Sequence, residues 1–172
     1  LYLPCINTAR RDLPEELTGL RVFTAEEVDA LIPTLSSLVS RQMGVASEIR
    51  ALLDKLKAAT NVEVNSMEGL DTANGDTTEV TALKHAAREA IMRYEDGWTE
   101  VQDLGAVVKD PRVGWLDFWG QHEGRYVWLC WLYGEQELSY FRELDADTTN
   151  GKVVRIRLTK EPHSQAPEKY LN

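Results

Sequence analysis

Cysteine and histidine are scarce in this chain, and their scarcity excludes several kinds of protein. The 172 residues include two cysteines and three histidines. Cys5 and Cys130 do not make the disulfide framework of a small secreted domain, and they suit a reducing compartment. His85, His122 and His163 lie far apart, without Cys-x-x-Cys or His-x-x-x-His spacing. The glycines make no phosphate-binding fingerprint. We therefore expect neither a metal site nor a cofactor.

Long apolar runs and an excess of positive charge are also missing. No apolar stretch approaches the roughly 18 residues needed to cross a bilayer, so we expect a soluble protein without a membrane span. The formal net charge is −9, and lysines and arginines are scattered among acids, which argues against binding to nucleic acid. Hydrophobic residues make up 43% and charged residues 27%, the balance of a single globular domain.

The two ends of the chain carry little periodicity. Residues 1–22 contain Pro4 and Pro14 and predict an extended N-terminal arm, and residues 159–172 predict an irregular tail. The numbered chain begins with Leu1 rather than methionine, which is compatible with removal of an upstream targeting peptide. The cytoplasm and the interior of an organelle are the two expected locations.

Two long segments carry apolar residues at three- and four-residue steps and predict a helical hairpin over residues 24–104. Thr24 is the predicted N-cap of the first helix, and Glu27 completes a capping box. Pro33 lies inside this helix, where we expect a kink rather than an end. The polar connection around Asn74-Gly75-Asp76 predicts a solvated linker. The helices should pair antiparallel in near-heptad steps, as in a coiled coil.

Residues 106–158 change to an extended pattern and predict a four- or five-stranded antiparallel meander. Its centre is Arg125–Tyr133, where every residue after the first is apolar, aromatic or a thiol, without alternation. Such a strand should be covered on both faces. The sequence therefore predicts one α+β domain over residues 23–158, with the long antiparallel hairpin packed on one face of the meander.

The opposite face of this sheet has no predicted cover. No other segment is long and amphipathic enough to shield it, so we expect a second copy of the chain or another subunit to do so. The predicted interface consists of four aromatic residues and one thiol: Trp115, Trp119, Tyr126, Trp128 and Cys130. The predicted function is a non-enzymatic interaction or assembly module, as a homodimer or as an accessory subunit of a larger complex.

A small enzyme or ligand-binding protein is the alternative. Its pocket would lie between hairpin and sheet, lined by tryptophans, with Asp117 and Arg142 as the working pair. Asp117 is predicted to pair with Arg142 or Arg125, or to act as a general base. Cys130 is interpreted as a small buried hydrophobe rather than a nucleophile activated by His122, and no catalytic residue is assigned. The candidate polar residues beside the sheet are Asp117, His122, Glu135, Arg142 and Asp145.

Several short motifs follow one another along the chain. They are Phe23-Thr24-x-x-Glu27, Leu31-Ile32-Pro33, Gly105-x-x-x-Lys109-Asp110, Leu116-Asp117-Phe118, Leu129-Cys130-Trp131, Gly134-Glu135 and Tyr140 to Asp145. Together, over roughly Phe23 to Asp145, they resemble the family catalogued as domain of unknown function 2203, known from bacterial hypothetical proteins. The resemblance implies a shared fold, and it does not indicate any particular activity. The chain departs from the family pattern at Arg142, where the pattern has a histidine, and after Asp145, where Gly-Phe is missing.

Overall fold

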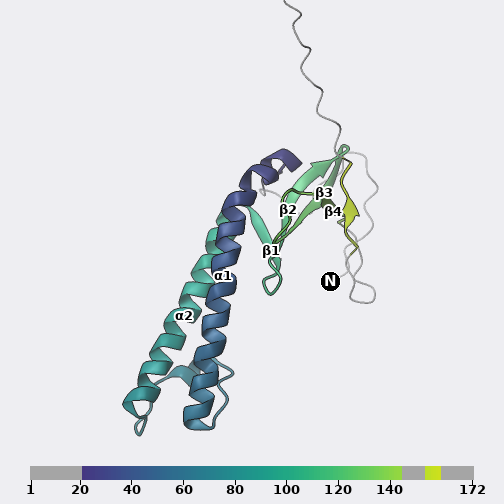
Figure 1. Cartoon of the computed structure of the whole chain (residues 1–172). Helices are drawn as coiled ribbons and strands as arrows, with labels where there is room; N and C mark the ends of the chain where they lie inside the picture. The colour runs from purple at the N-terminus through teal and green to yellow at the C-terminus, as the bar shows by residue number, and fades with distance from the viewer. Residues whose placement is uncertain (1–20, 145–153, 160–172) are drawn as a thin grey trace, which may run out of the picture.

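Two helices precede a five-stranded sheet (Figure 1). The structure is a computed structural model that describes residues 21–144 and 154–159. Helices α1 (Ala25–Thr60) and α2 (Thr78–Asp103) form the hairpin, with a short 3-10 helix η2 (Met67–Leu70) in their connection. One antiparallel sheet follows in chain order, made of β1 (Ala106–Asp110), β2 (Trp115–His122), β3 (Arg125–Leu132), β4 (Tyr140–Arg142) and β5 (Ile156–Arg157). The fold is α+β, as predicted. Most of the predicted arm and tail lies outside the described residues.

Local signals set the start of α1. The Thr24 hydroxyl accepts a hydrogen bond from the Glu27 backbone N–H at 3.2 Å, and the Glu27 carboxylate accepts one from the Thr24 N–H at 2.9 Å. The predicted capping box is therefore confirmed. Pro33 lies within α1 without ending it, and a left-handed Asn61 caps the far end. At about 1.5 Å per residue, the 36 residues make a rod of about 54 Å.

The seam between the helices contains a buried amide. Gln42 of α1 is only 1% exposed, and neither amide atom has a hydrogen-bond partner among the described residues. Gly97 of α2 lies opposite, where an added Cβ would come within 1.5 Å of Gln42 Nε2. The Gln42 side chain therefore fits only where α2 has no side chain, which fixes the register of the pair. Ion pairs Arg93–Glu48 and Arg41–Glu100 flank the seam and agree with antiparallel helices.

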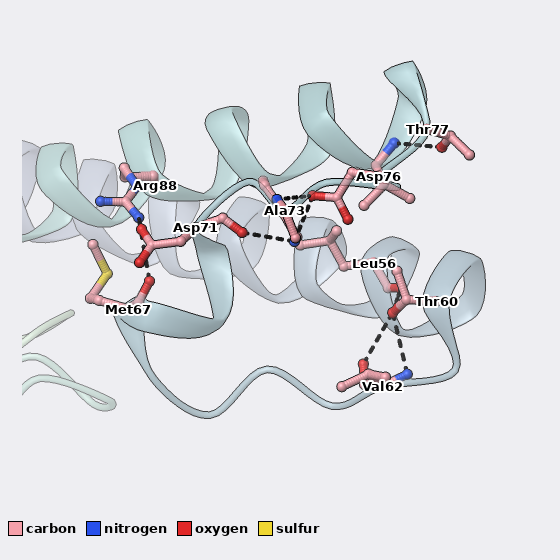
Figure 2. A network of polar contacts seen from close by, with 11 residues as sticks. Leu56, Thr60, Val62, Met67, Asp71, Ala73, Asp76, Thr77 and Arg88 are labelled. Atoms are coloured by element: carbon pink, nitrogen blue, oxygen red, sulfur yellow. Dashed lines mark hydrogen bonds and ion pairs between the residues drawn. The ribbon is translucent and has the colours of Figure 1, made fainter.

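The connection between the helices is fastened to the hairpin. Most of its side chains are exposed, as predicted, but Leu70 is 2% exposed and joins a distal cluster with Leu56, Val80 and Ala87. Figure 2 shows the polar part of this anchor: the Asp76 carboxylate accepts from the Ala73 N–H at 2.8 Å, and Asp71 pairs with Arg88 of α2. Asp76 also binds the nearly buried Lys84 ammonium at 2.9 Å. The connection is therefore largely solvated, as predicted, and is in addition anchored to the hairpin.

The main core joins one end of the hairpin to the sheet. Figure 1 shows the start of α1 and the end of α2 beside the strands, while the rest of the hairpin extends away. This arrangement differs from a hairpin laid along one face of the sheet. The buried residues of this core come from both helices, from four strands and from positions next to these elements: Phe23, Val28, Ile32, Leu35, Val39, Trp98, Val101, Ala106, Leu116, Phe118, Val127, Leu129, Trp131, Leu138, Phe141 and Leu158.

Phe23, which lies just before α1, is hydrogen-bonded to β2. Its N–H donates to the Trp119 carbonyl at 2.8 Å, and its carbonyl accepts from the Gln121 N–H at 3.2 Å. The ring packs edge-on against Phe118, with 5.2 Å between centroids. Gly120 is required here, because a Cβ would lie 2.4 Å from Leu129 Cδ1 and 2.8 Å from the Phe23 carbonyl oxygen. This contact positions the helices against the core side of the sheet.

Candidate interaction surface

The strand register divides the sheet into two faces. Residues paired across antiparallel strands point to the same side, and side chains alternate along each strand. Leu116, Phe118 and Leu129 therefore share the face that contributes to the main core. The other face, here called the outer face, is defined by the remaining alternate positions of β2 to β5 and the residue preceding β5: Trp115, Asp117, Trp119, Gln121, Tyr126, Trp128, Cys130, Leu132, Tyr140, Arg142, Arg155 and Arg157.

Asp117 lies at the centre of the outer face and is wholly buried. One carboxylate oxygen accepts from the Trp115 indole N–H at 2.8 Å, and the other accepts from Arg142 Nε and Nη2, each at 2.9 Å. The sequence predicted Arg142 or Arg125 as partner. The structure selects Arg142, whereas Arg125 pairs with Glu143 at 2.9 Å. Because both oxygens are held by donors of the same chain, Asp117 acts as an anchor for the side chains around it.

Cys130 is the cross-strand neighbour of Asp117 and is fully buried. Its thiol donates a long hydrogen bond to the Trp128 carbonyl, with 3.3 Å between Sγ and O. Burial, and then the negative charge of Asp117, raise the pKa of this thiol far above its ordinary value. The thiol therefore stays protonated and is a poor nucleophile, in agreement with its interpretation as a buried hydrophobe. His122 instead contacts the Phe141 ring, with 5.0 Å between centroids.

Arg155 fastens the last described segment to the outer face. Its Nη2 binds both Glu135 oxygens at 2.8 Å and the Cys130 carbonyl oxygen at 3.2 Å. The guanidinium also lies over the Tyr140 ring, 4.3 Å from the centroid, and more loosely over Trp115 at 5.8 Å. Glu135, a predicted site residue, accepts as well from the Leu132 N–H. Glu135 and Arg155 together hold residues 154–159 beside β4.

Sequence reasoning missed the contacts of Arg155 with Glu135 and Cys130 on the outer face. The alternation in residues 153–158 predicts an edge strand with Val154, Ile156 and Leu158 inward and both arginines facing water. Leu158 is indeed buried in the main core, whereas Val154 and Ile156 are exposed and Arg155 is half-buried. The alternation itself placed Arg155 on the face opposite the core. Its contact with Glu135 depends on two segments far apart in sequence.

The aromatic residues of the outer face differ in accessibility. Trp119 is 2% exposed, stacked on Tyr126 at 5.2 Å and packed edge-on against Trp128 at 5.4 Å. Tyr126 is 40% exposed, and Trp128 and Trp115 are half-buried. Of the five predicted interface residues, Trp119 and Cys130 are therefore covered by their own chain. Tyr126, Trp128 and Trp115 keep accessible surface.

Comparison with known proteins places the chain in a family. The family model described as "Uncharacterized conserved protein (DUF2203)" matches residues 21–153. The chain belongs to the DUF2203 family. The resemblance inferred from the motifs is confirmed, and the DUF2203 match includes every outer-face residue from Trp115 to Arg142. No curated protein and no solved structure matches the chain.

Arg142 makes two kinds of contact on the outer face of this DUF2203 chain. The arginine supplies Nε and Nη2 to Asp117 and lies over the Trp128 ring, 5.2 Å from the centroid. A guanidinium can do both at once because its donors lie in the plane that stacks on the ring. Arg142 therefore connects the buried carboxylate to a half-exposed tryptophan.

The polar pair of this DUF2203 chain lies away from the helices, which corrects the predicted pocket between hairpin and sheet. Asp117 and Arg142 belong to the outer face, and Asp145 lies outside the described residues. A hollow of about 380 Å³ beside the hairpin is lined by Met43, Ala46, Ser47, Arg50, Tyr94, Pro111 and Arg112, none of which was predicted. Within residues 21–144 and 154–159, no group of three or more metal-ligating side chains forms, and no helix could cross a membrane.

Proposed function

We propose that this DUF2203 protein is a non-enzymatic assembly module that binds another protein through the outer face of its sheet. The main observation behind the proposal is the partly exposed aromatic surface made by Trp115, Tyr126 and Trp128. Arg142 and Arg155 lie over parts of the two tryptophan rings, which still keep accessible surface. Tryptophan, tyrosine and arginine are the residue types that contribute most to binding energy in protein interfaces.

The buried polar groups favour a supporting role over catalysis. Both oxygens of Asp117 are occupied, and the Cys130 thiol is held protonated. The same contacts fix the rings above them, since Asp117 binds the Trp115 indole and Arg142 lies over Trp128. Side chains fixed before binding lose less conformational entropy when a partner docks. The cluster therefore gives the outer face a preformed shape.

The partner is either a second copy of the chain, giving a homodimer, or a different subunit of a larger complex. In both cases the half-exposed rings would form the centre of the contact. The hairpin would then extend away from the docked sheet and leave its distal half free.

Replacing Trp128 by aspartate tests this proposal. In sedimentation velocity at micromolar concentration, and in purification of the native complex, Trp128→Asp is expected to weaken association about 30-fold or more, because a hot-spot residue contributes about 2 kcal/mol. The matched control is Met92→Asp, since Met92 of α2 is 55% exposed and distant in sequence from the sheet. Equal association of the two variants, or an unmodified protein that is monomeric and recovered without companions, would overturn the proposal.

A further inference from the structure

Positive charge is concentrated on the outer face of a strongly acidic chain. Arg157 is the cross-strand neighbour of Tyr140, Arg142 lies two residues along the same strand, and Arg155 lies over the Tyr140 ring. Three arginines therefore lie on one small part of this face, although the chain carries a net charge of −9. Asp117 holds Arg142 and Glu135 holds Arg155, so two of the three charges are compensated.

The third charge is uncompensated. Arg157 is exposed and makes no ion pair with a carboxylate among the described residues. A guanidinium donates hydrogen bonds and never accepts them. The outer face thus presents an unpaired positive charge, with its donors, to solvent.

From this imbalance we propose that the surface docking on the outer face is a carboxylate-rich segment of a different protein. The inference rests on the proposed function and specifies the chemistry of its partner. A glutamate or aspartate can bind Arg157 with two parallel hydrogen bonds, while apolar neighbours pack on Tyr140 and Trp128. The partner supplies the negative charge that Arg157 lacks among the described residues.

Two other occupants fit less well. A twofold homodimer with the outer faces stacked would bring each uncompensated Arg157 towards the same surface of its copy, and like charges oppose such a contact. Single-stranded RNA also stacks on aromatic and arginine side chains. However, it carries a negative charge at every nucleotide and would extend beyond this small patch over a chain of net charge −9.

Fluorescence anisotropy with the full chain tests the inference. The probes are a short labelled peptide of alternating glutamate and leucine, the same peptide with glutamine for glutamate, and a labelled oligouridylate. We expect the glutamate peptide to bind best, and Arg157→Glu to weaken its binding by about tenfold or more. The control is Arg50→Glu, because Arg50 is exposed on α1 and makes no ion pair with the described residues. Neither exposed substitution should change the unfolding temperature.

Equal binding of the glutamate and glutamine peptides, equal effects of the Arg157 and Arg50 substitutions, or preferential binding of oligouridylate would overturn the inference. If Trp128→Asp abolishes assembly while the glutamate peptide does not bind, the inference fails and the proposed function stands. If the peptide binds at Arg157 but Trp128→Asp leaves assembly unchanged, the proposed function fails instead.

Discussion

Replacing Asp117 with alanine is expected to lower the free energy of unfolding by about 3–5 kcal/mol, because it removes one partner of a buried ion pair. The carboxylate is wholly buried and binds both Arg142 and Trp115. Without it, the guanidinium keeps its charge at a largely buried site, and the indole N–H loses its acceptor. Urea denaturation followed by tryptophan fluorescence measures the change.

A surface ion pair provides the control for this substitution. Glu48 pairs with Arg93 at 2.7 Å with both side chains about half exposed, so Glu48→Ala should change stability by no more than about 1 kcal/mol. Adding Arg142→Met to Asp117→Ala should recover part of the loss, because the unpaired charge is removed as well. Equal destabilisation by Asp117→Ala and Glu48→Ala would show that the buried pair does not support the sheet.

Replacing Gly105 with alanine is expected to destabilise the fold by about 2–5 kcal/mol, from backbone strain together with overpacking. Gly105 has φ +93°, and a Cβ there would lie 2.5 Å from Phe23 Cζ. The Phe23 ring is buried in the main core and has little room to move. Thermal and urea unfolding of the purified variant measure the effect.

A substitution at Gly134 distinguishes the effect of backbone strain from that of overpacking. Its φ is +99°, close to that of Gly105, but an added Cβ would meet nothing within 4 Å. Gly134→Ala should therefore cost only the strain, about 1–2 kcal/mol. If the two variants unfold alike, Phe23 does not hold the entry of α1 against the sheet as tightly as the structure indicates.

The parts of the fold that sequence reasoning predicted are those set by neighbouring residues. Thr24 and Glu27 are three positions apart, so their capping box can be recognised without tertiary information. The unbroken apolar character of β3 likewise indicates a strand with little exposed surface. Val127, Leu129 and Trp131 are indeed fully buried on its core side.

The parts that it missed depend on segments distant in sequence. Residue types indicated that Asp117 needs an arginine, but the choice of Arg142 follows from the register that pairs Trp128 with Arg142 and Asp117 with Cys130. Arg155 binds the Cys130 carbonyl oxygen because β5 pairs with β4 and brings the preceding residue to this face. No local signal reports such contacts, so the prediction treated the outer face as wholly uncovered.

The contact between Gln42 and Gly97 also depends on segments distant in sequence. Gln42 falls within the apolar stripe of α1, and nothing nearby in sequence indicates its partner on α2. Only the register of the two helices brings the amide against a residue without a side chain. Helix periodicity predicts which side of α1 is buried, but it does not predict which residues meet across the seam.

Hydroxyl-radical footprinting of the native assembly, compared with the isolated chain, tests most directly whether the outer face is the docking surface. We predict that oxidation of Tyr126, Trp128 and Tyr140 falls in the assembly, while the exposed Met67 and Met92 of the hairpin region are oxidised equally in both samples. Protection of the two methionines with no change at the three outer-face aromatics would contradict the account.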